Sequence, residues 1–244
     1  MIDIHCHLLY GVDDGPRNIE ASTVMLCEAA EQGITDIVLT PHYCHGIFPF
    51  DRERIEKNMS LLLPQARQLG IRLYLGTEYR VNSSIVSYLQ KGRCQTLADS
   101  PYVLTEYDFE AEYLYIRTMS QDLIFHGYIP ILAHVERCAC FLEEPQLLWE
   151  LKSLGVLVQV NCDSVLGKEG FRTKRFCKKL IKNRCVDFIA SDSHGTRKRV
   201  CNMQACYQYV EKKHGKECAQ TLMVDNPYRV IVKGKQFTKH SFQK

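Results

Sequence analysis

Residues 1–16, MIDIHCHLLYGVDDGP, place two histidines directly after a short apolar run. The run Ile2–Ile4 is rich in β-branched residues, which favours a β-strand. In an extended chain, side chains two residues apart point the same way. The pair His5 and His7 can therefore present both imidazoles to one metal ion. A single H-x-H pair also occurs at capping and core positions, so this interpretation needs support from the rest of the chain.

The remaining sequence alternates between strand-like and helix-like patterns. Six further runs of the same kind predict strands at Asp36–Thr40, Ile71–Leu75, Tyr102–Thr105, Ile129–Ala133, Val156–Val160 and Val186–Ala190. Apolar residues at roughly helical spacing predict helices at Asn18–Gln32, from Asp51 towards Leu69, and at Ala111–Phe125, Pro145–Leu154, Thr173–Asn183 and Arg199–His214. Strands that alternate with helices favour parallel pairing, and so predict an α/β barrel or a doubly wound sheet.

Turn and capping residues mark the ends of the first two helices. Gly33 and Gly70 stand where a C′ glycine would end them, and Asp51 can cap the second. Pro64 inside the second helix predicts a kink or a break. No internal repeat or linker-like segment interrupts the pattern, so we predict one domain over residues 1–244. The tail after Asn226 begins with a short apolar run and turns polar, which predicts that about its last ten residues are mobile.

Composition restricts the class of protein. The chain has 244 residues, of which 45% are hydrophobic and 24% charged, which is typical of a soluble globular protein. A net charge of +3 does not by itself argue for nucleic acid, and none is expected as a partner. No run of about 18 apolar residues predicts a membrane span. Twelve cysteines with no secretory segment before them are typical of reduced thiols, which predicts a cytoplasmic protein.

Histidines and carboxylates stand at the ends of six of the seven predicted strands. In chain order they are His5, His7, His42, Glu78, Glu106, His134, Asp192 and His194. The carboxyl ends of parallel strands lie on one face of an α/β barrel, where catalytic groups gather. Imidazole together with carboxylate suits Zn, Mn or Fe. Each residue alone has an ordinary structural explanation, but their order and position together predict a metal site. A carboxylate such as Glu78 could bridge two ions there and so favour a hydroxide nucleophile.

Other residues exclude alternative chemistries. None of the cysteines has an arginine six positions later, so the C-x5-R loop of a thiol-based tyrosine phosphatase is absent, and so is a P-loop motif. The remaining histidines do not stand at strand ends and are predicted to be surface or loop residues; they are His45, His126, His214 and His240. Cys6 and Cys44, which lie beside predicted ligands, are expected to be small core or loop residues.

These motifs match a known family over residues 1 to about 232. The matching segments are MIDIHCHLLYGVDDGP, TPHY, LGTEYR, LTEY, ILAHVER, QVNCDSVLGKEG, IASDSHGTRKR and DNPYRVI. The chain resembles the PHP (polymerase and histidinol phosphatase) superfamily. More closely, it resembles the bacterial manganese-dependent protein tyrosine phosphatases encoded in capsule and exopolysaccharide clusters. The resemblance implies a distorted seven-stranded (β/α)7 barrel of the PHP type.

The resemblance also implies three divalent metal ions, with manganese favoured and iron or zinc left open. The first ion would take His5, His7, Glu78 and Asp192. The second would share Glu78 and take Glu106 and His134. The third would take Asp14, His42 and His194. Asp13 could compete with its neighbour Asp14, although the family pattern favours Asp14.

Three arginines are implied to face the substrate phosphate: Arg80, Arg137 and Arg199. The chain departs from the family pattern at Val135, where a proline is usual, and between His194 and Arg199, where it is more basic than expected. Neither departure touches a proposed ligand.

The expected activity is metal-dependent hydrolysis of phosphotyrosine in proteins. The resemblance implies as substrate the autophosphorylated Tyr-rich tail of a bacterial tyrosine kinase that controls capsular or exopolysaccharide synthesis. The alternatives are a histidinol-phosphate or other small-molecule phosphoesterase, and a phosphodiesterase or exonuclease that uses the same site. A non-catalytic metal-binding regulator is a third alternative, disfavoured by the complete ligand set. The oligomeric state, including a homo-oligomer, stays open.

Overall fold

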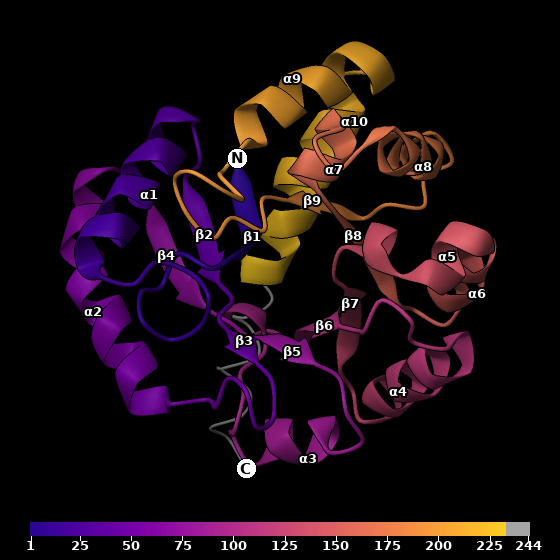
Figure 1. Ribbon diagram of the computed structural model, residues 1–244, viewed down its shortest axis with the longest axis horizontal. Helices are drawn as coiled ribbons and strands as arrows, with labels where there is room; N and C mark the ends of the chain where they lie inside the picture. The colour runs from indigo at the N-terminus through magenta and orange to yellow at the C-terminus, as the bar shows by residue number, and fades with distance from the viewer. Residues whose placement is uncertain (233–244) are drawn as a thin grey trace.

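The computed structural model describes residues 1–232, so the predicted mobile stretch near the C-terminus lies outside the described residues. Two parallel sheets form its centre (Figure 1). The smaller has the order β1-β2-β4, with strands Ile2–Cys6, Asp36–Leu39 and Arg72–Leu75. The larger has the order β3-β5-β6-β7-β8-β9, with strands His42–Tyr43, Glu78–Arg80, Tyr102–Glu106, Ile129–Leu132, Leu157–Asn161 and Phe188–Ala190. Each of the seven predicted strands has a counterpart among them.

Short interruptions explain why the strands divide into two sheets. The chain passes from β2 to β3 through Thr40 and Pro41, and from β4 to β5 through Gly76 and Thr77. Proline has no N–H to donate to a ladder. At Gly76 a Cβ atom would lie 2.7 Å from the Leu97 side chain, so a larger residue there would displace Leu97.

The two sheets also meet at the other edge of the smaller one. There His7 N donates to Ser193 O at 2.9 Å, and Asp192 N donates to His5 O at 2.8 Å. These contacts curl the parallel sheet and bring the end of β1 beside the segment that follows β9. The fold is therefore α/β with a curled parallel sheet. The implied count of seven strands is not confirmed, because the described residues form nine strand segments.

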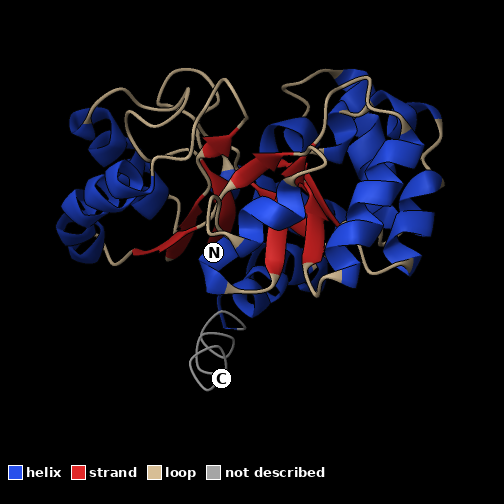
Figure 2. Ribbon diagram, turned by 90° about the horizontal axis from the view of Figure 1, so that it is seen from below, coloured by secondary structure: helices blue, strands red, loops and turns tan. Residues whose placement is uncertain are grey.

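Helices surround the sheets, as Figures 1 and 2 show. The longer ones are α1 (Ile19–Glu31), α2 (Arg52–Gln68), α4 (Tyr113–Phe125), α8 (Phe171–Lys182) and α9 (Met203–His214). The shorter ones are α3 (Ile85–Gln90), α5 (Ala139–Glu143), α6 (Leu147–Ser153), α7 (Cys162–Leu166) and α10 (Lys216–Gln220). Three single turns, η1 (Leu97–Asp99), η2 (Val135–Arg137) and η3 (Thr221–Asp225), complete the set, and residues 226–232 are also helical. Within residues 1–232, no helix has both the length and the apolarity needed to cross a membrane.

The structure departs from two local predictions. Helix α2 continues through Pro64 without the break that was an alternative there. Its buried side, which includes Ile55, Leu62 and Ala66, packs into the core. The free energy gained by this burial exceeds the loss of one backbone hydrogen bond at the proline. The last predicted helix begins at Met203 instead of Arg199. His194 N–H donates to Arg199 O at 2.9 Å and closes a loop there, with Arg199 in the left-handed region at φ 49°.

The largest part of the core packs helices against the strands, and a second part fills the interior of the curled sheet below the strand ends. Alternate strand residues, among them Ile2, Ile4 and Leu104, form a buried cluster with Val230 and Ile231 from the helical residues 226–232. The C-terminal helical segment therefore packs against the interior, while the loops after the strands gather on the opposite side (Figure 2). Apolar side chains therefore pack at the end covered by residues 226–232, and polar side chains gather at the carboxyl ends of the strands.

Candidate metal centre

Three groups of side chains at the carboxyl edge of the strands have the composition and spacing of metal ligands. The ligand atoms of each group all lie within 4.8 Å of one another. The groups are His5, His7, Glu78 and Asp192; His7, Asp14, His42 and His194; and His42, Glu78 and Glu106. The remaining predicted ligand, His134, has its Nε2 atom 2.8 Å from Glu78 Oε1 and 3.7 Å from Glu106 Oε1. The structure therefore brings all nine predicted ligands together.

Glu78 lies at the centre of this arrangement. Its Oε2 atom lies 3.2 Å from His5 Nε2, 3.1 Å from His7 Nε2 and 3.0 Å from His42 Nδ1. This oxygen is buried, and none of these contacts has hydrogen-bond geometry. Burial alone would raise the pKa of Glu78, but His5 and His42 hold it well below its ordinary value. An ionised carboxylate on which several imidazole nitrogens converge has the form of a bridging ligand.

The group around His5 is completely buried. His5 Nε2 lies 3.2 Å from His7 Nε2 and 3.3 Å from Asp192 Oδ1. Burial by itself would lower the pKa of His5, but the Glu78 and Asp192 carboxylates raise it to about 9. In the absence of a metal ion, the carboxylates thus hold a proton on the imidazole. A divalent cation would supply the same positive charge, so these residues fit a metal ion.

Polar residues behind this group orient its imidazoles. His7 Nδ1 lies 2.8 Å from Asp13 Oδ2, and His5 Nδ1 lies 3.3 Å from Gln159 Oε1. A hydrogen bond at Nδ1 fixes the tautomer and directs Nε2 towards an ion. Gln159 Nε2 donates to Asn161 Oδ1 at 2.8 Å, and Asn161 Nδ2 donates to Asp192 Oδ2 at 2.7 Å.

Sequence reasoning missed these orienting residues. Gln159 and Asn161 alternate at the end of β8, the one predicted strand for which no polar terminal residue was noted. That alternation was the available signal. Asp13 was considered only as a competitor of Asp14.

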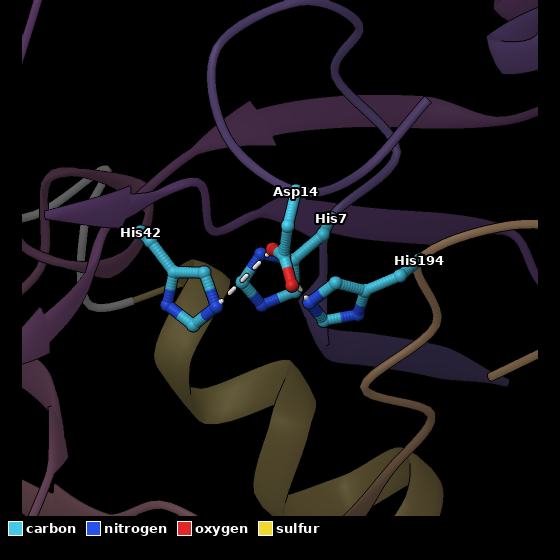
Figure 3. A group of neighbouring side chains, drawn as sticks. All are labelled: His7, Asp14, His42 and His194. Atoms are coloured by element: carbon cyan, nitrogen blue, oxygen red, sulfur yellow. Dashed lines mark ion pairs between the residues drawn. The ribbon is translucent and has the colours of Figure 1, made fainter. Parts of the chain in front are cut away.

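The second group gathers around Asp14, as Figure 3 shows. Asp14 Oδ1 lies 3.4 Å from His42 Nε2 and 3.2 Å from His194 Nε2. The His194 Nδ1 atom lies 3.0 Å from Asp192 O, to which it can donate, leaving Nε2 buried and without a hydrogen bond. Burial, assisted by His7, lowers the pKa of His194 to about 4, so its ring is neutral near pH 7. A neutral imidazole with an unshared lone pair is what a cation requires of this ligand.

Asp13 and Asp14 are thereby distinguished. The Asp13 side chain is fully buried against His7, and its Oδ2 atom also accepts from His42 N at 3.0 Å. The Asp14 side chain is 46% exposed and faces the imidazoles of His42 and His194. The geometry is therefore consistent with a ligand role for Asp14 and an orienting role for Asp13.

The three arginines lie at the rim of the centre. Arg137 Nη1 donates to Asp192 Oδ2 at 3.0 Å, and Arg199 Nη2 donates to Asp192 Oδ1 at 2.8 Å. Arg80 contacts Asp108, and its Nη1 atom lies 3.5 Å from Glu106 Oε2. All three guanidinium groups stand next to the carboxylates of the centre. Their contact with a phosphate stays a prediction.

Among the other histidines, His45 and His126 are exposed, and His214 is partly buried at the end of α9. His240 lies outside the described residues. The twelve cysteines are all free, and none belongs to a metal-binding group in residues 1–232. Cys6 is buried, with Sγ 3.2 Å from Ser193 Oγ, and Cys44 is partly buried beside β3.

A family model described as "Capsular polysaccharide synthesis, CpsB/CapC" matches residues 1–232, the whole described segment. The chain belongs to the CpsB/CapC family. It is 33% identical over 239 residues to the tyrosine-protein phosphatase CpsB of Streptococcus pneumoniae, covering 95% of this chain and 98% of that protein. It is 32% identical over 219 residues to the tyrosine-protein phosphatase YwqE of Bacillus subtilis, covering 89% and 86% respectively.

Solved structures agree with this assignment. A crystal structure from the work on YwqE of Bacillus subtilis and CpsB of Streptococcus pneumoniae, described as metal-dependent tyrosine phosphatases, matches with a TM-score of 0.88 and 31% identity. The match covers 96% of this CpsB/CapC family chain and 95% of that chain. A histidinol phosphate phosphatase of Lactococcus lactis shares the fold alone, with a TM-score of 0.60 and 14% identity. The resemblance to the PHP-type tyrosine phosphatases is confirmed.

Proposed function

We propose that this CpsB/CapC family member hydrolyses phosphotyrosine in proteins with divalent metal ions held at the strand ends. The observation that carries the proposal is Glu78, whose carboxylate is buried, ionised and approached by four imidazoles. Relatives that align over nearly the whole chain are named tyrosine-protein phosphatases, which supports the choice of substrate class.

The proposed cofactors are three divalent ions, with Mn²⁺ favoured over iron or zinc. The first would be held by His5, His7, Glu78 and Asp192. The second would be held by Glu78, Glu106 and His134, and the third by Asp14, His42 and His194. The first set coincides with one spatial group, and the third falls within another, to which His7 also belongs. Both His42 and His134 contact Glu78, at 3.0 and 2.8 Å. The ligands of the second ion are therefore the least clearly separated from those of the third.

The proposed chemistry divides the work between ions and side chains. Bound divalent ions would lower the pKa of a coordinated water and neutralise charge on the phosphoryl group. Arg137 and Arg199, which pair with Asp192 at the rim of the centre, would bind phosphate oxygens through their planar guanidinium groups. Asp13 and Gln159 hold the His7 and His5 rings in place. Tyrosine leaves as a phenolate with an ordinary pKa of about 10, so a strong general acid is dispensable.

The proposed physiological substrate is the autophosphorylated Tyr-rich tail of a bacterial tyrosine kinase in capsular or exopolysaccharide synthesis. The family description, which names capsular polysaccharide synthesis, supports this context. A cytoplasmic location is proposed with it, supported by twelve cysteines that form no disulfide. For the fold, we propose one seven-stranded barrel domain, in which β2 with β3 and β4 with β5 each count as one interrupted strand.

The test is a phosphatase assay on a phosphotyrosine peptide, a phosphoserine peptide and histidinol phosphate, each with Mn²⁺, Zn²⁺, Fe²⁺ or EDTA. We expect metal-dependent release of phosphate from phosphotyrosine and its loss in EDTA. His5→Ala and Asp192→Ala should each abolish turnover, whereas His126→Ala, an exposed histidine on the far end of α4, should not. Turnover of histidinol phosphate alone would refute the substrate, and full activity of both ligand variants would refute the metal centre.

A further inference from the structure

A pocket of about 720 Å³ opens directly beside the metal centre. It shares Asp14, His194 and Arg199 with that centre. Its other walls come from the segment before α1, from Ala21 and Met25 of α1, and from the loop Gly195–Lys198. We call it the basic pocket, because its lining carries the cations Arg17, Arg197, Lys198 and Arg199. Its volume is that of a site for a small ligand or a few residues of peptide.

Two closed loops hold these cations in position. The hydrogen bond from His194 N to Arg199 O, at 2.9 Å, closes the loop that carries Arg197 and Lys198. A hydrogen bond from Gly11 N to Pro16 O, at 2.8 Å, closes the loop that precedes Arg17. The first loop starts at His194, and the second contains Asp13 and Asp14. The backbone that carries the cations is therefore held beside the metal centre.

The charge of the basic pocket is largely uncompensated. Arg199 pairs with Asp192 and Asp14. Within residues 1–232, Arg17, Arg197 and Lys198 make no ion pair, and Asp14 is the only carboxylate that lines the pocket. Arg197 and Lys198 are exposed, so their charges are available to a ligand.

The opposite flank of the centre differs. A second pocket, of about 470 Å³, is lined by Arg80, His45, Tyr88 and Asp108. There Asp108 contacts the guanidinium group of Arg80 and compensates its charge. Among the described residues, the only lysine or arginine that lines this second pocket is therefore paired, whereas three of the four that line the basic pocket are not. This asymmetry would orient a substrate that carries negative charge on one side.

We propose that the basic pocket binds an anionic group of the substrate that lies next to the phosphotyrosine in the chain, either a carboxylate or a second phosphate. The inference rests on the proposed function, because the pocket adjoins the centre that would hold the phosphotyrosine. Guanidinium groups bind both kinds of oxyanion bidentately. The basic pocket thus selects phosphotyrosine sites in acidic or multiply phosphorylated segments.

The experiment compares three peptides of equal length that contain phosphotyrosine with neutral flanks, with glutamate flanks, or with a second phosphotyrosine. We expect kcat/KM for both anionic peptides to exceed that for the neutral peptide by about 2- to 30-fold at low salt, which corresponds to about 0.4–2 kcal/mol for two exposed charge pairs. The two anionic peptides separate the carboxylate from the phosphate as the favoured group. The preference should shrink as added salt screens it.

The discriminating variant is Arg197→Ala with Lys198→Ala. We expect it to remove the preference, through KM, while kcat/KM for the neutral peptide stays within about twofold of the unaltered protein, because exposed charges away from the phosphate act weakly. Lys178→Ala with Lys179→Ala, which removes two exposed charges of α8 outside the pocket, should leave the preference intact.

Each outcome decides between the two proposals. If the neutral peptide is hydrolysed as fast as the anionic ones, or if the variant keeps the preference, the basic pocket does not select substrates and only this inference fails. If no phosphotyrosine peptide is hydrolysed, the proposed function fails and this inference fails with it. Hydrolysis of a single-stranded oligonucleotide that the variant loses would also overturn the inference, since the pocket would then be a nucleic-acid path.

Discussion

Adjacent aspartates in the DDG turn have different environments. Asp13 is buried and binds the Nδ1 side of His7, whereas Asp14 is half-exposed and faces two imidazoles. The difference arises because the two carboxylates have different tasks. Asp13 contacts the ring nitrogen of His7 that faces away from the proposed ions, whereas a ligand such as Asp14 must face an ion itself. A second polar chain, from His5 through Gln159 and Asn161, does the same work from the other side.

The first prediction concerns Asp13→Asn. The amide keeps the shape of the carboxylate but weakens the hydrogen bond to His7 Nδ1, so we expect a 10- to 100-fold loss of Mn²⁺ affinity, roughly the cost of losing such an orienting partner. Isothermal titration of the metal-free protein measures it. Asp108→Asn, at an exposed carboxylate on the rim, serves as the control and should change the affinity little. An unchanged Mn²⁺ affinity in Asp13→Asn would show that Asp13 does not orient His7 for metal binding.

Two contacts between elements hold the smaller sheet in the shape that presents the ligands. Strands β2 and β4 are joined by Asp36, which accepts from Arg72 Nε at 2.6 Å and from Arg72 Nη2 at 2.8 Å. Helix α2 covers the smaller sheet with a buried face that includes Leu62. Both strands lead directly into the segments that carry His42 and Glu78.

The second prediction concerns Asp36→Asn. Burial alone would raise the pKa of Asp36, but hydrogen bonds from Arg72 and Thr35 lower it below its ordinary value. A lowered carboxyl pKa stabilises the fold above the unfolded pKa, and that stability is lost as the pH falls through the folded value. Urea unfolding should therefore show Asp36→Asn to be less stable by about 1–3 kcal/mol at neutral pH. This difference in unfolding free energy between the unaltered protein and the variant should decrease as the pH falls below about 4. A difference in unfolding free energy that stays constant with pH would show that the ion pair is not its cause.

The third prediction compares two neighbours on α2. Leu62 is fully buried, whereas Leu61 is 50% exposed. Leu62→Ala should lower the free energy of unfolding by about 2–5 kcal/mol, because it leaves a cavity in the core. Leu61→Ala should change it by no more than about 0.5 kcal/mol. Equal losses in urea unfolding would mean that α2 does not pack as described.

For the whole molecule, the metal centre draws together positions from His5 to His194, which belong to both sheets and to the loops after them. An ion bound there would connect segments that are distant in the chain. The unfolded chain has no such site, so the binding free energy adds to the stability of the native state.

The fourth prediction follows from that linkage. At a free Mn²⁺ concentration 100 times its Kd, the native state gains about 2.7 kcal/mol for one ion. For a chain of this size we expect a rise in Tm of about 5–10 °C, which calorimetry with Mn²⁺ and with EDTA measures. The double variant His5→Ala with His7→Ala, which removes two ligands of the first proposed ion, should show a smaller rise on adding metal. Identical Tm values for the unaltered protein under both conditions would contradict the centre.

The sequence by itself determined the alternation of strands and helices, the imidazoles and carboxylates at the strand ends, and the family. These features depend on short-range spacing: a period of two places His5 and His7 on one side of a strand, and parallel strands place their ends together. Asp51 was likewise correctly predicted as a cap, with Oδ1 accepting from Arg54 N at 3.1 Å.

Only the tertiary structure decided which polar residues stand behind the ligands, where the strands break, and where the cations gather. Gln159 and His5 lie 154 positions apart, and Arg199 and Asp14 lie 185 apart. Contacts at such separations depend on how the sheet curls and the loops close, and local propensity carries no information about them. The same holds for the loop at Arg199, where a hydrogen bond from His194 overrode a helical pattern and placed the basic pocket beside the metal centre.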